Sequence, residues 1–321
     1  MLNNYQYFIA LAEELNISKA ADRLFISHQC LSKYLRKLEQ EYNVAFFERT
    51  PRLSLTSAGQ VYLDMLRQVQ LLESNTENQL NDIRQSKKGL IRFGTTEGRY
   101  RIMIPDLLSS FQRVYPDVRL EPRYATSDRL CELVLKNELD LALLNRRDIN
   151  QNQFDVRTVL NERLYLVISD HLLAQFFPDR YPGCREKFLG GVDLADFHKR
   201  GVPFVLSYEG YNSRDTLETY LRSRGFELNC TMEMTQQDLH YMLAARDYAA
   251  CFCWAMYLPS IQDYNLHAEH NRLNVFPVKG LNTVNQVVLV IPKGKILPTY
   301  GKELMRQIRE IAATFTQDPT V

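Results

Sequence analysis

The chain has 321 residues, which is too long for one small domain and predicts two or three domains. Its 39 lysines and arginines are balanced by 38 aspartates and glutamates, so any affinity for nucleic acid must come from a local patch. The sequence has neither a signal-peptide pattern nor an apolar stretch of the ~20 residues that a membrane span needs. Because its six cysteines are scattered, we expect reduced thiols and a cytoplasmic location.

Residues 17–56 have the pattern of a helix-turn-helix followed by a wing. Ser18 is expected to cap a short helix with a small apolar face, and Ser27 to cap a second helix after a turn at Phe25 and Ile26. Apolar residues at helical spacing predict the buried face of the second helix: Leu31, Leu35, Leu38 and Tyr42.

The opposite face of this second helix carries polar and basic side chains that can reach base edges and phosphates in a major groove. In the segment FFERTPRLSLT, two short strands would place Arg49 and Arg52 near the tip of a wing, close to a phosphate or the minor groove. A charge run is usually a solvated face, and His28 can equally be a plain exposed histidine. On the second helix of a helix-turn-helix, however, the pattern favours DNA contacts from Ser27, His28, Gln29, Ser32, Lys33, Arg36, Arg49 and Arg52.

A long helix is predicted from Ser57 to about Ser86, capped by Thr56. A heptad-like seam runs along it, with Leu80 one step out of place: Tyr62, Met65, Val69, Leu72, Thr76 and Ile83. Such a seam can pair two helices or pack on its own domain, and the length and polar remaining faces favour pairing. A homodimer presents two recognition helices and therefore predicts an inverted-repeat site in double-stranded DNA.

From Gly89 onward, strand-like and helix-like segments alternate, which predicts an α/β domain with a parallel sheet covered on both faces. Ligands in such sheets bind at the carboxyl ends of strands and the amino ends of helices. Position alone therefore suggests a ligand site, although each residue can also be a helix cap or turn residue: Thr95, Thr96, Thr126, Ser127, Ser207 and Tyr208.

Several arginines lie between the predicted strands, and solvated surface is the simpler interpretation of each one: Arg99, Arg101, Arg146, Arg147 and Arg214. If several converge on the ligand site, an anionic molecule such as a carboxylate is the expected effector.

Three functions other than ligand-controlled DNA binding are alternatives for this sequence. An enzyme is disfavoured because the sequence has no phosphate-binding glycine loop, nucleophile elbow or metal-ligand spacing, so no catalytic or metal residue is expected. A redox sensor would use Cys251 and Cys253, but we expect these thiols on opposite faces of a strand, in an apolar run that lowers their reactivity. The third alternative is an architectural DNA binder without a ligand.

The chain resembles the LysR-type transcriptional regulators. The segments YFIALAEELNISKAADRLFIS, LSKYLRKLE, FFERTPR and LTSAG carry the resemblance in the first part, and GLIRFGTT, IPDLLSSFQRVYPDVRLE, ELDLALL and VLNERLYLVIS carry a looser one beyond it. The resemblance implies a mainly helical winged helix-turn-helix over 1–57, a linker helix over 58–88 and an effector-binding domain over 89–321. The last has two lobes, as in type 2 periplasmic solute-binding proteins, with lobe I at about 89–163 and 269–321 and lobe II at about 164–268.

The same resemblance implies no cofactor, a small-molecule effector in the cleft between the lobes, a homodimer or dimer of dimers, and RNA polymerase as a further partner. It also adds Asn145 or Arg146 to the effector positions. Two segments depart from the family pattern. His28-Gln29-Cys30 begins the recognition helix in an unusual way, and the segment 244–255 lacks a glycine-rich turn, so that Phe252 and Trp254 are expected to narrow or reshape the cleft.

Overall fold

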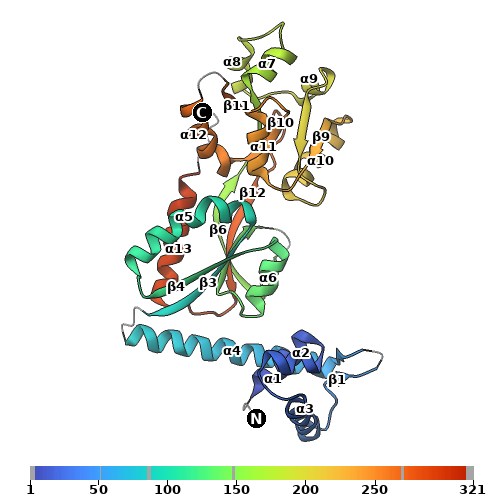
Figure 1. The fold of residues 1–321 in the computed structure, drawn as a ribbon, viewed down its shortest axis with the longest axis vertical. Coiled ribbons are helices and arrows are strands. Elements are labelled where there is room, and N and C mark those ends of the chain that lie inside the picture. Colours follow the sequence, from blue (N-terminus) through green and yellow to red (C-terminus); the bar gives the residue numbers. More distant parts are fainter. Residues whose placement is uncertain (1–3, 51, 85–87, 147–148, 269–270, 316–321) are drawn as a thin grey trace. The chain divides into compact units, whose positions relative to one another are not determined.

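The computed structural model describes residues 4–50, 52–84, 88–146, 149–268 and 271–315. The chain divides into two compact units, one formed by Met1–Gln85 with Gly294–Pro298 and the other by Ser86–Lys293 with Thr299–Val321 (Figure 1). Among the described helices, none is long and apolar enough to cross a membrane.

The first unit is a winged helix-turn-helix continued by a long helix. Its elements are α1 (Tyr5–Glu14), α2 (Ile17–Arg23), α3 (His28–Tyr42), β1 (Phe47–Glu48), β2 (Ser54–Leu55) and α4 (Ser57–Ile83). One apolar core joins them, in which Phe8, Leu31, Leu35 and Leu66 are at most 1% exposed. The predicted helix-turn-helix, wing and long helix are therefore confirmed as elements.

Two of the three predicted caps are confirmed in this unit. Ser27 accepts a hydrogen bond from the Cys30 amide at 3.2 Å, and Thr56 accepts one from the Gly59 amide at 3.0 Å. The expected cap at Ser18 is wrong, because Asn16 precedes α2 and accepts from the Lys19 amide at 3.1 Å.

Two tyrosines differ from expectation. Tyr42 does not belong to the buried face of α3, since it remains 38% exposed while its ring packs against Phe46 and Tyr62. Tyr62 does not belong to a dimer seam, because it is 6% exposed and packs in the core of its own unit against Phe8. The reason is that the start of α4 packs against α1 and the wing, so Gly59, Tyr62 and Leu63 on one side of its first two turns are buried.

The second unit contains two sheets. The sheet of lobe I has the order β4-β3-β5-β12-β6 and consists of β3 (Gly89–Thr95), β4 (Val118–Tyr124), β5 (Leu141–Asn145), β6 (Phe154–Glu162) and β12 (Asn285–Pro292). Its helices are α5 (Glu97–Val114), α6 (Ser127–Leu135) and α13 (Thr299–Ala313). β3 pairs in parallel with β4 and β5, whereas β12 is antiparallel to both β5 and β6.

The sheet of lobe II has the order β11-β7-β10-β8-β9 and consists of β7 (Leu164–Ser169), β8 (Pro203–Leu206), β9 (Asn229–Glu233), β10 (Ala250–Trp254) and β11 (Leu273–Pro277). Its helices are α7 (Asp170–Phe176), α8 (Cys184–Leu189), α9 (Leu194–Lys199), α10 (Asn212–Arg224), α11 (Gln237–Ala244), η1 (Ala255–Tyr257) and α12 (Leu258–His267). β8 is parallel to β9 and β10, while β7 is antiparallel to β10 and β11.

The prediction of a purely parallel sheet is therefore wrong. A chain that leaves one sheet for the other and then returns must enter each sheet in the opposite direction, which makes the strands at the crossings antiparallel. The outward crossing is Arg163, between β6 and β7. The return lies between Pro277 and Asn285, since β11 still pairs in lobe II, so lobe II extends beyond the expected boundary near residue 269.

Candidate nucleic-acid interface and ligand cleft

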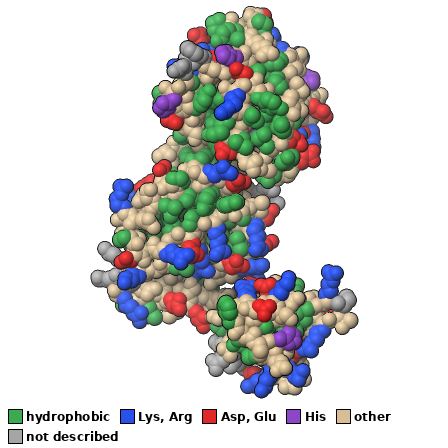
Figure 2. All heavy atoms as spheres, viewed as in Figure 1, with side chains coloured by type: hydrophobic (Ala, Val, Ile, Leu, Met, Phe, Trp, Pro, Cys, Tyr) green, Lys and Arg blue, Asp and Glu red, His purple; other side chains and the backbone are tan. Residues whose placement is uncertain are grey.

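The exposed face of α3 carries the residues expected to read DNA. Ser27, His28, Gln29, Lys33 and Arg36 are exposed, and Ser32 is half-buried. Within the described part of the chain, neither Lys33 nor Arg36 forms an ion pair with a carboxylate, so both charges are available to a phosphate or a base. In Figure 2, basic side chains gather on the lower face of this unit, over α3 and beside the β1–β2 turn.

The wing is fixed to α3 by one carboxylate. Glu39 Oε1 accepts from the amides of Phe46 and Phe47 at 2.9 and 3.3 Å, and Glu39 Oε2 lies 3.8 Å from Arg49 Nη2. This arrangement positions the exposed Arg49 and Arg52 at the β1–β2 turn. Arg49 therefore has a partly compensated charge, whereas Arg52 has no carboxylate partner in the described residues.

An apolar stripe remains exposed along α4. Its members, with their exposed fractions, are Val61 at 71%, Met65 at 38%, Leu72 at 65%, Leu80 at 44% and Ile83 at 77%. Side chains of this kind on one helix are suited to burial against a second helix.

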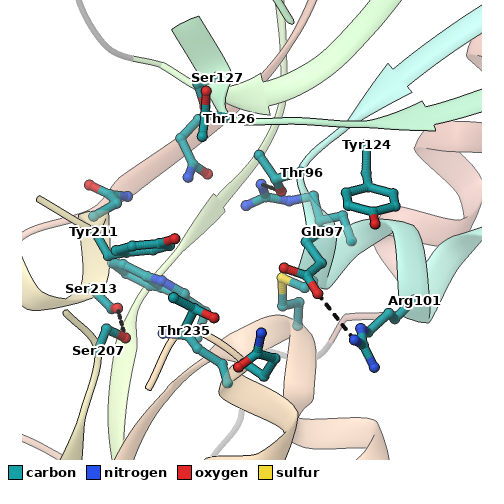
Figure 3. Close-up of a pocket in the computed structure, with 18 of the residues that line it drawn as sticks. Thr96, Glu97, Arg101, Tyr124, Thr126, Ser127, Ser207, Tyr211, Ser213 and Thr235 are labelled. Carbon is teal, nitrogen blue, oxygen red and sulfur yellow. Dashed lines mark hydrogen bonds and ion pairs between the residues drawn. The ribbon is translucent and has the colours of Figure 1, made fainter. Parts of the chain in front are cut away.

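A cleft of about 540 Å³ lies in the second unit and is lined by residues of both lobes (Figure 3). Five of the eight expected effector residues line it: Thr96, Thr126, Ser127, Asn145 and Ser207. Thr126 caps α6 through the Arg129 amide, and Ser207 Oγ lies 2.8 Å from Ser213 Oγ. The volume falls in the range of small-molecule sites, which is roughly 300–1,000 Å³.

Thr95, Arg146 and Tyr208 do not line the cleft, so the structure does not bring them together with the other five. Thr95 is buried and its hydroxyl donates to the Leu143 carbonyl at 2.9 Å, while Arg146 donates to Gln286 Oε1 at 3.0 Å. Consecutive side chains of extended backbone point in opposite directions, so only one of two neighbours at a strand end can face a ligand.

Most of the lobe II residues that line the cleft are not indicated by the sequence pattern. The loop before α10 and the first turn of that helix contribute Glu209, Gly210, Tyr211, Asn212 and Ser213. The loop before α11 and the first turn of that helix contribute Thr235, Gln236, Gln237 and Asp238. Strand β9, which precedes α11, was not predicted because all five of its residues are exposed and lack an apolar alternation. Finding that strand would have placed the start of α11 at the same edge of the sheet.

Two of the five arginines line the cleft, and both are paired with carboxylates. Arg146 and Arg214 do not line it, and Arg147 lies outside the described residues. Arg99 lines it but is buried in an ion pair with Glu162 at 2.7 Å, and Arg101 pairs with Glu97 at 3.1 Å and with Asp238 at 3.3 Å.

The aromatic residues of β10 leave the cleft open. Phe252 points into the core of lobe II, where its ring stacks on Phe204 at a centroid distance of 5.5 Å. Trp254 lines the cleft together with Tyr257, and both are largely buried. The expected narrowing by Phe252 is therefore wrong, because its ring is buried inside lobe II against Phe204 and only Trp254, at the end of the strand, reaches the cleft.

The two cysteines of β10 lie on the same face of the strand, contrary to expectation. Their Sγ atoms are 4.0 Å apart, as alternation requires for residues separated by one position. Both are fully buried, and burial raises the pKa of the Cys251 thiol, with a smaller contribution from the Cys253 thiol beside it. Burial and a raised pKa keep the thiol protonated, which disfavours reaction with an oxidant.

A winged helix-turn-helix with an unpaired basic face and a two-lobed domain with an open cleft define the class of ligand-responsive DNA-binding regulators. The family model for bacterial regulatory helix-turn-helix proteins of the lysR family matches residues 2–60, and the model for the LysR substrate binding domain matches residues 84–313. The chain belongs to the LysR family of transcriptional regulators.

Relatives with curated names are regulators and not enzymes. The chain is 31% identical over 175 residues to the uncharacterized HTH-type transcriptional regulator YnfL of Escherichia coli, covering 54% of this chain and 59% of YnfL. It is 31% identical over 145 residues to the HTH-type transcriptional regulator AlsR of Bacillus subtilis, covering 45% of this chain and 48% of AlsR. These matches thus span about half the length of each relative.

Solved structures show the same fold. Full-length OxyR from Pseudomonas aeruginosa superposes with a TM-score of 0.62 at 19% identity and covers 94% of this chain and 95% of that chain. CbnR in complex with its target DNA superposes with a TM-score of 0.53 at 18% identity and covers 95% of this chain and 97% of that chain.

Proposed function

We propose that this regulator binds an inverted-repeat operator as a homodimer and that a small molecule in the cleft controls the outcome. α3 enters the major groove with Gln29, Ser32, Lys33 and Arg36 toward base edges and phosphates, and Ser27 and His28 lie at the start of the same helix. Arg49 and Arg52 contact the adjoining phosphates or minor groove.

The observation that carries this proposal is the unpaired basic face of α3. Elsewhere on the molecule arginines are commonly paired, as Arg23 is with Glu13 at 2.9 Å, whereas Lys33 and Arg36 have no carboxylate partner in the described residues. Basic groups held unpaired on a capped recognition helix are suited to phosphate and base contacts.

The dimer is supported by the exposed apolar stripe of α4. Pairing two copies along this stripe would bury Leu72 and Ile83 and present two copies of α3 to one operator. A dimer of dimers and contact with RNA polymerase are further steps of the same proposal.

Selection of binding sites from a random pool of duplex DNA tests the proposal. We expect enrichment of one inverted repeat with half-sites spaced by about one helical turn. Enrichment of a single unrepeated site would contradict the dimeric arrangement. Equal binding to all sequences, sensitive only to salt, would instead support an architectural role.

A further inference from the structure

The cleft of the second unit has an unusual charge balance. Four carboxylates and two guanidinium groups line it: Glu97, Asp128, Glu209, Asp238, Arg99 and Arg101. One of the two guanidinium groups is paired with a further carboxylate, that of Glu162. The cleft therefore carries an excess of negative charge.

Both guanidinium groups are paired with carboxylates, so neither offers an uncompensated positive charge to an anionic ligand. Arg99 and Glu162 form a buried ion pair, with side chains 3% and 0% exposed, and Arg99 Nη1 also donates to Thr96 Oγ1 at 3.1 Å. Arg101 is shared between Glu97 and Asp238, which together outweigh its charge.

Two carboxylates at the cleft are not compensated. Asp128 in lobe I and Glu209 in lobe II are exposed, and neither forms an ion pair with a described Lys or Arg. Since they belong to different lobes, a ligand in the cleft meets negative charge from both sides.

Aromatic rings also face the ligand space. Tyr124 and Tyr211 come from opposite sides of the cleft in Figure 3 and are 60% and 44% exposed, so each has a free surface for a ligand. Trp254 and Tyr257 line the cleft where it is more enclosed. The faces of such rings attract cations, and carboxylates beside them strengthen that preference.

Helix N-termini at the cleft would by themselves favour an anion, because each carries a partial positive charge of about half a unit. α5 and α11 both begin there without a side-chain cap, but each has a carboxylate in its first turn, Glu97 and Asp238. A full negative charge more than offsets the partial positive one. The uncapped amides remain able to donate to a neutral oxygen of a ligand.

From this charge balance we infer that the effector is a small organic molecule that carries an ammonium group and no net negative charge. The inference rests on the proposed function, since it assigns a chemical class to the ligand of the same cleft. The ammonium group lies among the carboxylates and the faces of Tyr124 and Tyr211, and hydroxyl or carbonyl oxygens accept from the helix amides.

The chain offers a built-in reporter for this inference, because Trp254 is its single tryptophan and lines the cleft. We would titrate the full-length protein and follow tryptophan fluorescence with two matched trios: phenethylamine, phenylacetate and phenethyl alcohol, then putrescine, succinate and butanediol. Saturable changes with an amine, at least about tenfold tighter than with its matched carboxylate, are expected. Tighter binding of a carboxylate or an alcohol, or no response to either amine, would overturn the inference.

Variants that remove the charge of the cleft carboxylates but keep their size test whether that charge binds the amine. The double variant Asp128→Asn with Glu209→Gln should weaken amine binding by about tenfold and leave the alcohols unchanged. Glu132→Gln on the exposed part of α6, outside the lining, is the matched control and should change nothing. Unchanged amine binding in the double variant would also overturn the inference.

The test distinguishes this inference from the proposed function. If a carboxylate binds and shifts the affinity for the selected DNA site, the ligand class is wrong but the ligand-responsive regulator stands. If amines bind as expected and the protein has no preferred DNA site, the ligand class stands and the proposed function fails.

Discussion

Phe25 combines two features that oppose stability at a single residue. Its φ of 55° lies in the left-handed region, which costs a residue with a Cβ about 1–2 kcal/mol, and its side chain is 97% exposed. Asn tolerates this conformation better than other residues with a Cβ. We therefore expect Phe25→Asn to raise the free energy of unfolding by roughly 0.5–1 kcal/mol in urea denaturation. Phe25→Ala, which keeps the unfavourable conformation, is the control, and equal stability of the two variants would contradict the explanation.

Arg36 has its guanidinium exposed and without a carboxylate partner in the described residues. If it touches a phosphate, Arg36→Ala should weaken binding to all sequences alike. The slope of log binding constant against log salt concentration should then become shallower by about one. If it reads a base, about 1–3 kcal/mol of discrimination at one position should disappear instead. Fluorescence anisotropy at several salt concentrations measures both. Arg113→Ala on α5 is the control, and a variant that binds as the parent does would remove Arg36 from the interface.

At the scale of elements, the start of α4 is fixed by a close approach to the wing. A Cβ added at Gly59 would lie 2.1 Å from the Phe46 carbonyl oxygen and 2.7 Å from a Leu55 methyl carbon. Because the first of these is backbone, Gly59→Ala must shift α4 or the wing, and we expect a loss of about 2 kcal/mol or more. Thermal unfolding measures it. Ser57→Ala, two residues earlier and exposed, should behave like the parent; a similar loss there would implicate the helix start in general.

The start of α7 is held by a cluster around Asp247. Burial raises the pKa of Asp247, but hydrogen bonds from Ser169, Asn271 and His171 together outweigh burial and hold the pKa below its ordinary value. A lowered carboxylate pKa stabilises the fold at neutral pH, and this contribution is lost as the pH falls below about 4.

Asp247→Asn tests this cluster, since Asn has the same size and tolerates the φ of 58° at this position. The variant should be less stable than the parent at pH 7 by roughly 0.5–1 kcal/mol, a small value because the carboxylate is partly exposed. The difference should shrink as the pH is lowered below the ordinary carboxylate pKa. A difference that does not change with pH would assign the effect to packing.

Elements with strong apolar periodicity could be predicted from the sequence, and weakly patterned ones could not. α3 was predicted because Leu31, Leu35 and Leu38 mark one face. β9 was missed because it is an exposed edge strand, and β6 because its pattern is mostly half-buried or exposed. Strand direction was also beyond local patterns, because it depends on where the chain crosses between lobes.

At the scale of the whole molecule, the exposed stripe of α4 predicts self-association. Leu72→Glu combined with Ile83→Glu should shift the protein to monomers in light scattering, since the like charges of two copies would meet in the seam. Both side chains are exposed in one copy, so the fold should survive. Asn81→Asp adds a charge about half a turn away from the stripe on α4 and should leave the dimer intact. A double variant that remains dimeric would place the interface elsewhere.

The candidate cleft could be predicted as a location but not as a chemical environment. Strand ends and helix starts correctly indicated Thr96, Thr126 and Ser207 as lining residues. No local pattern indicates that Arg99 is neutralised by Glu162, 63 positions away, or that Arg101 pairs with Asp238 of the other lobe. Charge compensation is a property of tertiary contacts, and local sequence patterns do not show it.

The exposed loop 208–211 between β8 and α10 has a consequence for how such regulators diversify. Gly210 has a φ of 82° and open space where a side chain would be, and its neighbours Glu209 and Tyr211 are exposed toward the cleft. Substitutions at residues 209–211 change neither the core of lobe II nor the sequence of the DNA-reading helix. A lineage could therefore acquire a new chemical signal through a few changes in one short loop while keeping the same operator, and a biosensor could be retuned in the same way.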